Sequence, residues 1–372
     1  MPCTTARPDG GFRTGDRGNT AGVRIVITGA SGNLGTALLR RLTGHDVVGV
    51  CRRPPEGGEP YAGVRWVPLD LSAPAPALGP VLEGADAVVH LAWGFQPSRD
   101  AAYLERLGVG GTRAVVEAAQ AAGVPHLVHL SSLGAYSPGA DVPVDESWPT
   151  RGIGSLAYSR HKVAAERILD DHERRHPDGT AVARMRPGLV LQRAAGSALL
   201  RYGMPAYVPA GVLRYLPLLP LDRRLVVPVV HADDVADAIV RVLERRATGA
   251  FNLAAEPPVD RDVIAAALGA RPVHLPAPVL RTAAALAWRL RVQPLDPGWI
   301  DLAFAVPLLD TTRARTELGW TPAVPADAAL REVLDGMVDH AGTTSPVLRR
   351  RTVRGELDDL VRGGPIGSRA RP

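Results

Sequence analysis

Lys162 is the only lysine among the 43 Lys and Arg residues of the chain, and it follows Tyr158 by four positions. On a helix, residues four apart lie on one face, so the ammonium and the phenol would be neighbours. A cation beside a phenol favours phenolate and lowers the tyrosine pKa from its usual value of about 10. The pair therefore predicts a tyrosine that acts as a general acid and base. A surface helix with one stray lysine is the alternative.

A glycine-rich segment, Gly29-Ala-Ser-Gly-Asn-Leu-Gly35, is the second chemical signal. Gly29 would allow a tight turn, Gly32 a close approach of the backbone to a pyrophosphate, and Gly35 close packing of helix on strand. Such a pattern arises readily by chance in a glycine-rich chain. Here a β-branched run at 23–28 precedes it and an amphipathic stretch at 34–42 follows it. This context predicts a dinucleotide site at a helix N-terminus.

The residues after the second and third expected strands concern the choice of cofactor. Residues 46–51 are followed by Arg52 and Arg53 rather than by an acidic residue that would bind a ribose 2′-hydroxyl. Arginine suits a 2′-phosphate, so we expect NADP, with NAD possible and a solvated turn as the alternative. Asp70 could accept a hydrogen bond from the adenine amino group, or cap its own turn.

Alternating strands and helices must position these residues. Short apolar runs occur at residues 23–28, 46–51, 64–70, 85–91, 126–131 and 180–186, and helical patterns separate many of them, the longest over 101–122. This alternation predicts an α/β fold with a doubly wound, Rossmann-type parallel sheet. Ligands bind beyond the carboxyl ends of such strands, where the glycine loop, Ser132 and Pro187 fall.

The net charge of +5 resides in the two ends of the chain. Residues 341–372 contain seven arginines against three acidic residues, and residues 1–22 contain three against two, which leaves 23–340 neutral. A neutral body is not typical of a nucleic-acid-binding protein. Both ends read as disordered tails, the second one basic. Between them we expect a dinucleotide-binding domain at 23–190 and mainly a substrate lobe at 191–340, with segments returning to the first domain.

Several site and compartment classes lack support in the sequence. Two cysteines, Cys3 and Cys51, are too few for a disulfide framework. No N-terminal apolar segment resembles a signal peptide, and no apolar run is long enough to cross a bilayer. The ten histidines lack metal-ligand spacing. We therefore expect a cytoplasmic protein with no metal site and no membrane or nucleic-acid partner.

In its motifs and their order, the chain resembles the extended short-chain dehydrogenases/reductases, also called the NAD-dependent epimerase/dehydratase family. Besides the glycine loop, the shared motifs over about residues 23–335 are Asp70-Leu71, His90-Leu-Ala92, Leu130-Ser-Ser-Leu-Gly-Ala-Tyr136, Tyr158-Ser-Arg-His-Lys162, Arg186-Pro187, Val230-His-Ala-Asp-Asp-Val235, Phe251-Asn-Leu253 and residues 309–322. The resemblance implies a dinucleotide domain with a smaller C-terminal lobe over a small-molecule substrate. It also makes a homodimer through two helices of the first domain plausible.

The resemblance assigns roles to individual residues. Tyr158 would exchange the proton on the substrate oxygen, Lys162 would hold the nicotinamide ribose and tune the phenol, and Ser132 would hydrogen-bond the reacting oxygen. A strand-end serine that bonds backbone is the alternative for Ser132. The implied cofactor-binding residues are Gly29, Ser31, Gly32, Asn33, Leu34, Gly35, Arg52, Arg53, Asp70, Leu71, Leu91, Ala92, Tyr158, Lys162 and Pro187.

Departures from the family pattern narrow the reaction. Leu133 and Gly134 stand where dehydratases carry an Asp-Glu pair, and the residues after Pro187 lack the elements typical of nucleotide-sugar members. Gly108 replaces an asparagine common in the family, and Trp93 replaces a small residue beside the nicotinamide. We expect an NAD(P)-dependent oxidoreductase acting on a carbonyl or alcohol of a small, fairly apolar substrate. The alternatives are a sugar or nucleotide-sugar epimerase with bound NAD and a non-catalytic dinucleotide-binding sensor.

Three expectations concern the second half of the chain. The apolar, proline-rich residues 196–226 could form a lid over a hydrophobic substrate, although an ordinary core segment fits as well. Asp233 and Asp234 are expected to cap a helix at 235–243. Tryptophans at 288, 299 and 320 are expected to pack rather than to recognise a ligand.

Overall fold

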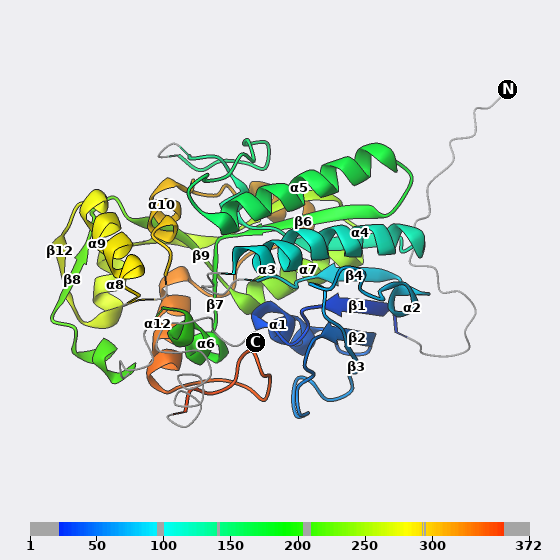
Figure 1. Cartoon of the computed structure of the whole chain (residues 1–372), viewed down its shortest axis with the longest axis horizontal. Helices are drawn as coiled ribbons and strands as arrows, with labels where there is room; N and C mark the ends of the chain where they lie inside the picture. Colours follow the sequence, from blue (N-terminus) through cyan, green and yellow to red (C-terminus); the bar gives the residue numbers. More distant parts are fainter. Residues whose placement is uncertain are drawn as a thin grey trace.

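A seven-stranded parallel sheet forms the centre of the molecule (Figure 1). The computed structural model describes residues 22–94, 100–139, 142–203, 210–291, 293 and 295–352. The strand order is β10-β6-β5-β4-β1-β2-β3. The strands are β1 Arg24–Thr28, β2 Asp46–Cys51, β3 Arg65–Pro68, β4 Ala87–His90, β5 His126–Leu130, β6 Ala181–Pro187 and β10 Gly249–Leu253. The chain winds outward from β1 to β3 and then resumes at β4 on the other side, which confirms the predicted doubly wound fold.

Helices cover both faces of the sheet because the side chains of each strand alternate between the faces. In β1, Ile25 and Ile27 pack in one core layer, whereas Val26 packs in the other. Helices α1 and α7 cover the first layer, and α2, α4 and α5 cover the second. Their bounds are α1 Asn33–Arg41, α2 Gly79–Leu82, α4 Gly111–Ala121, α5 Ala157–Arg175 and α7 Ala232–Arg245. Burial on both faces explains why the strands read as continuous apolar runs.

The helix expected over 101–122 is divided into three consecutive segments. They are α3 Ala101–Glu105, a π-helical turn η1 Arg106–Gly110, and α4. A π turn widens the helix locally and is common at functional sites. Here it contains Gly108, whose position against the active site is described below.

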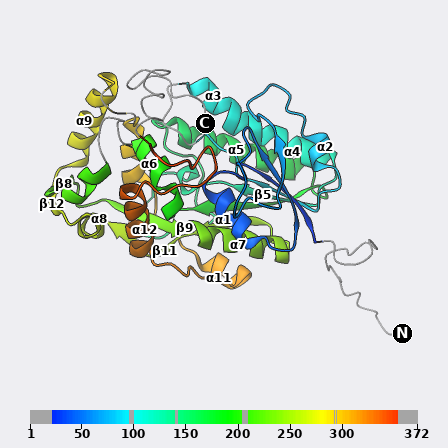
Figure 2. The ribbon, with the colours of Figure 1, turned by 90° about the horizontal axis from the view of Figure 1, so that it is seen from below.

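The second half of the chain forms a smaller lobe beside the sheet (Figure 2). It contains a three-stranded sheet, β11-β9-β7, and a pair, β12-β8. The elements are β7 Leu189–Leu191, β8 Leu218–Leu221, β9 Val226–His231, β11 Ala255–Asp260, β12 Arg271–His274, α6 Gly196–Gly203, α8 Arg261–Leu268, α9 Ala277–Arg289, α10 Gly298–Ala305 and α12 Ala326–Val338. From the same half of the chain, β10 is a strand of the main sheet, and α7 and α11 (Thr312–Leu318) pack against that sheet.

Residues 341–352 correct part of the prediction of a disordered C-terminal tail. We call them the C-terminal strap, drawn in red between α6 and α1 (Figure 1). Ser345 and Leu348 are buried, and the Ser345 hydroxyl donates to the Ser31 carbonyl at 2.6 Å. The strap was missed because these contacts join positions about 300 apart, beyond any local pattern. The rest of the expected tail, 353–372, and residues 1–21 lie outside the described residues.

The N-terminus of α7 also differs from expectation. His231 is the N-cap, and its ring nitrogen accepts from the backbone N–H of Asp233 at 3.1 Å. Asp234 instead accepts from the N–H groups of Ala323 and Val324, at 2.9 and 3.1 Å. Asp234 therefore attaches the segment between α11 and α12 to α7, a role that only the tertiary contact reveals.

Two kinds of feature are absent from the part of the chain that the structure describes. No helix there has the length and apolar character needed to cross a membrane. Nor does that part of the chain contain a group of three or more His, Cys, Asp or Glu side chains arranged to hold a metal ion.

Candidate active site

The carboxyl edge of the main sheet opens onto a cavity of about 490 Å³, lined by both parts of the molecule. Among the predicted site residues, those that line it are Gly29, Ser31, Gly32, Asn33, Leu34, Gly35, Arg52, Arg53, Leu71, Leu91, Ala92, Ser132, Tyr158, Lys162 and Pro187. Because the strands are parallel, their carboxyl ends bring these distant segments together. Asp70 alone is not part of the lining.

The glycine loop has the shape that a dinucleotide requires. Gly29 has a φ of +73°, and a Cβ there would lie 2.7 Å from the backbone nitrogen of Ala92. At Gly35 a Cβ would lie 2.3 Å from the Ala30 carbonyl oxygen. No side chain caps α1 at Gly32. The N–H groups of the first turn of α1 thus remain available to a pyrophosphate on the cavity side.

Arg52 and Arg53 bring positive charge to the cavity at the end of β2. The Arg52 guanidinium lies over the ring of Tyr103, 5.7 Å from its centroid. Burial lowers the pKa of Arg53, and the charges of Arg52 and Arg349 lower it further. This local positive field favours an anionic group of the ligand.

Asp70 lies beside the cavity and stabilises its own turn. Its Oδ1 atom accepts from the backbone N–H of Ser72 at 2.8 Å and from the Ser72 hydroxyl at 2.7 Å. The structure thus shows the capping arrangement that the sequence left open as the alternative to adenine recognition.

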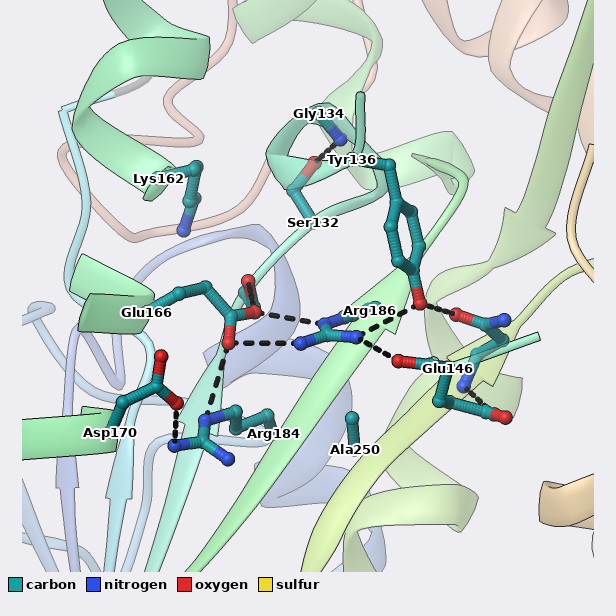
Figure 3. Close-up of polar contacts among 12 residues, drawn as sticks. Ser132, Gly134, Tyr136, Glu146, Lys162, Glu166, Asp170, Arg184, Arg186 and Ala250 are labelled. Atoms are coloured by element: carbon teal, nitrogen blue, oxygen red, sulfur yellow. Dashed lines mark hydrogen bonds and ion pairs between the residues drawn. The ribbon is translucent and has the colours of Figure 1, made fainter. Parts of the chain in front are cut away.

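The three predicted catalytic residues meet where β5 ends and α5 begins. The Ser132 hydroxyl accepts from the Gly134 N–H at 3.0 Å (Figure 3). The same hydroxyl is hydrogen-bonded to the Tyr158 phenol. Lys162 lies one turn after Tyr158 on α5, and its Nζ donates to the Leu130 carbonyl at 2.7 Å. The bond from Gly134 is the backbone contact considered as the alternative for Ser132, and the bond to Tyr158 places the same hydroxyl beside the phenol.

The protonation of Tyr158 and Lys162 is governed by burial. Burial raises the pKa of Tyr158 to about 12, although the hydrogen bond from Ser132 acts in the opposite direction. Burial also lowers the pKa of Lys162 well below its usual value, opposed by the charge of Glu166. The expected lowering of the phenol pKa is thus absent from this structure. Burial outweighs the hydrogen bond from Ser132, and the Lys162 Nζ donates to the Leu130 carbonyl rather than to the phenol oxygen.

Trp93 is the immediate neighbour of the Lys162 ammonium. Nζ lies 3.4 Å from the Trp93 ring centroid, a cation–π contact. The indole is also edge-on to the ring of Tyr158, at 6.3 Å between centroids. A Cβ at Gly108 would lie 3.1 Å from the indole. Trp93 thus fills the space that the absent side chain at Gly108 leaves, and the two departures from the family pattern are spatially linked.

Trp299 corrects a further expectation. Its ring lies 5.2 Å from that of Tyr158, tilted by 35°, and it lines the cavity rather than only packing in the lobe. Tyr158 therefore contacts two indoles, one from each part of the molecule. The sequence contained no local signal for this, because Trp299 is on α10 and approaches Tyr158 only after the lobe folds over the sheet.

A buried ion network supports α5 beneath Lys162. Glu166, four residues after Lys162, accepts from the Ser131 hydroxyl at 2.5 Å and from two nitrogens of Arg186 at 2.9 and 3.1 Å (Figure 3). Arg184 approaches it at 3.2 Å. Burial would raise the pKa of Glu166, but the bonds and charges of these partners hold it below its usual value. Glu166 is absent from the sequence prediction, although its i,i+4 spacing from Lys162 was a usable signal.

Arg186 extends this network to the last strand of the sheet. Its Nη1 donates to the Tyr136 hydroxyl at 3.1 Å, and that hydroxyl donates to the Asn252 side chain at 2.7 Å. Burial raises the pKa of Tyr136 to about 12. The Arg-Pro and Phe-Asn-Leu motifs are thus joined by buried hydrogen bonds through Tyr136.

Two buried histidines lie behind the catalytic residues. His90 bonds Thr28 at 2.6 Å and Thr112 at 3.2 Å. Burial, with the charge of Lys162, lowers the pKa of His90 to about 3. Burial likewise lowers that of His129 well below its usual value. Both His129 nitrogens are buried without a hydrogen-bond partner in the described part of the chain.

Residues 196–226 show how the small lobe borders the cavity. Helix α6 contributes Ala198 and Leu199 to the lining. Arg201 does not enter the cavity; it donates to the carbonyl groups of Val347 and Arg349 in the strap. Residues 204–209 of the proposed lid lie outside the described residues.

Known proteins resemble this chain in sequence and in fold. The profile of the NAD dependent epimerase/dehydratase family matches residues 25–254. An uncharacterized protein of Mycobacterium tuberculosis is 29% identical over 83% of this chain, which spans only 29% of that longer relative. A 3-diazoavenalumate denitrifying reductase of a Streptomyces species is 30% identical over 82% of this chain and 97% of its own length. The UDP-glucose 4-epimerase of Thermus thermophilus, solved with NAD, has a TM-score of 0.61 at 21% identity, over 85% of this chain and 99% of that one.

Proposed function

Because the chain belongs to the NAD-dependent epimerase/dehydratase family, we propose that it is an NADP(H)-dependent reductase of a small, apolar and flat substrate. Carbonyl groups are the reaction centre that the Ser132, Tyr158 and Lys162 arrangement suits best. The relation to a Streptomyces enzyme named as a reductase supports reduction rather than epimerisation.

The character of the cavity wall next to Tyr158 carries this proposal. Only apolar residues and one glycine line the described cavity from the end of β6 through the small lobe. They are Pro187, Gly188, Leu189, Val190, Ala195, Ala198, Leu199, Val227, Trp299, Leu302, Ala303 and Val306. A nucleotide sugar carries many hydroxyl and phosphate groups, which need polar partners once they leave water. The two indoles that contact Tyr158 also line the cavity and instead offer flat surfaces on which a planar substrate can stack.

The choice of NADP rests on the positive charge at the end of β2. Arg52 and Arg53 line the cavity there, and Asp70, the nearest acidic candidate for the adenosine, is occupied by its own turn. Guanidinium groups bind a 2′-phosphate in a charge-assisted manner. NAD stays possible, because the glycine loop would hold the pyrophosphate of either dinucleotide.

The catalytic residues would act as proton donor and as positioning groups. With a pKa of about 12, the Tyr158 phenol is protonated at neutral pH and can donate its proton to a developing alkoxide. Ser132, bonded to that phenol, would hydrogen-bond the reacting oxygen of the substrate, and Lys162, one turn later on α5, would hold the nicotinamide ribose. When bound, the nicotinamide supplies or accepts the hydride. Burial of the site by both parts of the molecule excludes water from the transfer.

Oxidation of NADPH, followed at 340 nm with a panel of apolar and aromatic aldehydes and ketones, tests the proposal. We expect turnover with several members of the panel and its loss in Tyr158→Phe, with cofactor binding retained. Turnover of UDP-glucose by protein that retains NAD⁺ would favour the epimerase instead. Cofactor binding without any turnover, unchanged in Tyr158→Phe, would favour a sensor.

A further inference from the structure

The C-terminal strap is attached to the glycine-loop domain by three hydroxyl groups. Ser345 is fully buried and donates to the carbonyl of Ser31 within the loop at 2.6 Å. Thr343 bonds the Tyr61 hydroxyl at 2.7 Å, and Thr344 donates to the Gly57 carbonyl at 2.8 Å. These bonds fix the strap against the side of the domain on which a dinucleotide is expected.

The other side of the strap is attached to helix α6 of the small lobe. Arg201 donates to the carbonyl groups of Val347 and Arg349, each at 2.7 Å. The backbone N–H of Arg351 donates to the Ser197 hydroxyl at 3.1 Å, and Leu348 is buried with 1% of its surface exposed. The strap is thus held from both parts of the molecule, across the boundary between them.

Between these attachments the strap forms a wall of the cavity. Pro346, Val347 and Leu348 line the cavity that Arg52 and Arg53 also line. Arg349 follows directly. Burial lowers the pKa of Arg53, and the charges of Arg52 and Arg349 lower it further. The Arg349 Nη1 donates to the carbonyl of Pro346 at 3.4 Å, so its guanidinium lies beside a residue of the cavity wall. Like charges gathered at a cavity wall are stabilised when an anion binds between them.

We propose that the C-terminal strap is part of the cofactor site and that Arg349, with Arg52 and Arg53, binds the 2′-phosphate of NADP(H). The inference rests on the proposed function in its choice of NADP. It adds a specificity residue from outside the segment that matches the family, since Arg349 lies about 95 positions beyond residue 254. The apolar residues of the strap then pack against the dinucleotide.

Binding of NADPH and NADH to Arg349→Gln, measured by isothermal titration, tests this proposal. We expect NADPH to bind at least tenfold more weakly than to the wild type, while NADH changes by less than twofold. The fragment 2′,5′-ADP should lose affinity in the same way, and 5′-ADP should not. Arg350→Gln is the matched control, because Arg350 is exposed and adjacent in sequence. Arg349→Lys should restore part of the affinity, and melting temperatures verify folding.

The outcomes separate this inference from the proposed function. If the wild type prefers NADPH and Arg349→Gln keeps that preference, the inference is wrong and the choice of NADP stands. Equal losses for NADPH and NADH would also overturn the role of Arg349. Tighter binding of both cofactors to Arg349→Gln or Ser345→Ala would show that the strap obstructs the site. A wild type without preference for NADPH would overturn both, whereas absence of carbonyl turnover with the expected binding would overturn only the reaction.

Discussion

Gly108 and Trp93 show how two substitutions at the residue scale reshape the site together. The indole occupies the place of the missing side chain, makes an edge contact with Tyr158 and lies against the Lys162 ammonium. An aromatic face partly replaces the solvation that the buried ammonium has lost. Each departure from the family pattern is visible in the sequence, but their complementarity depends on the π turn that brings Gly108 to Trp93.

Restoring an asparagine at Gly108 tests this complementarity. We expect Gly108→Asn to lower the free energy of unfolding by about 1–3 kcal/mol, because the new side chain would collide with the Trp93 ring. Trp93→Ala should relieve most of that loss in the double variant, as urea denaturation of the three proteins would show. Additive effects in the double variant would mean that the two positions do not share one space.

The requirement for lysine at position 162 can be tested by keeping the charge. We expect Lys162→Arg to lower kcat on the order of 100-fold, because the forked guanidinium misfits a position that is 2% exposed and faces an indole. Kinetics with a substrate identified in the panel, alongside NADPH affinity and melting temperature, would measure the effect. Near-wild-type kcat would contradict a specific role for the ammonium.

At the scale of elements, one face of α5 carries the predicted catalytic residues Tyr158 and Lys162. The same face carries Glu166, which supports them, one turn later. Tyr158 and Lys162 reach the cavity, and Glu166 holds Ser131 and two arginines of β6 beneath them. These bonds hold α5 in one position against β6. The carboxylate therefore contributes to the site without lining the cavity.

Neutralising this carboxylate should destabilise the fold strongly. We expect Glu166→Gln to lower the free energy of unfolding by about 3 kcal/mol, because it leaves Arg184 and Arg186 without their shared buried charge. Asp170→Asn is the control: its side chain is 55% exposed, so its pair with Arg184 should contribute below about 1 kcal/mol. Equal effects of the two substitutions in denaturant unfolding would contradict a buried network centred on Glu166.

On the scale of the whole molecule, a parallel sheet, a lobe and a strap enclose groups that are isolated from water. His90 and His129 lie inside, and burial lowers the pKa of both. Below pH 6.5 the unfolded chain therefore binds protons at these two histidines, whereas the folded protein keeps them neutral until a lower pH. Their contribution to stability is complete above the unfolded pKa of about 6.5 and is lost as the pH falls below it.

The melting temperature should therefore decrease as the pH falls from 6.5 to 5. We expect His129→Leu to reduce the pH dependence of the free energy of unfolding by up to about 1.4 kcal/mol per pH unit, the contribution of one proton. His45→Gln, at an exposed position, should leave the profile unchanged. The window lies above the range in which Glu166, whose pKa is lowered, loses its contribution on protonation. An unaltered profile in His129→Leu would show that this ring does not govern the acid response.

The sequence by itself determined the doubly wound sheet and the composition of its carboxyl edge. Strands, helices and the glycine loop follow from local periodicity and backbone geometry, and parallel strands then place Tyr158 and Lys162 beside the loop. Only the tertiary structure decided that Trp299 adjoins Tyr158, that Glu166 joins two arginines, and that the strap lines the cavity. Such contacts join residues distant in the chain, and their energy depends on shape and burial, which no local pattern encodes.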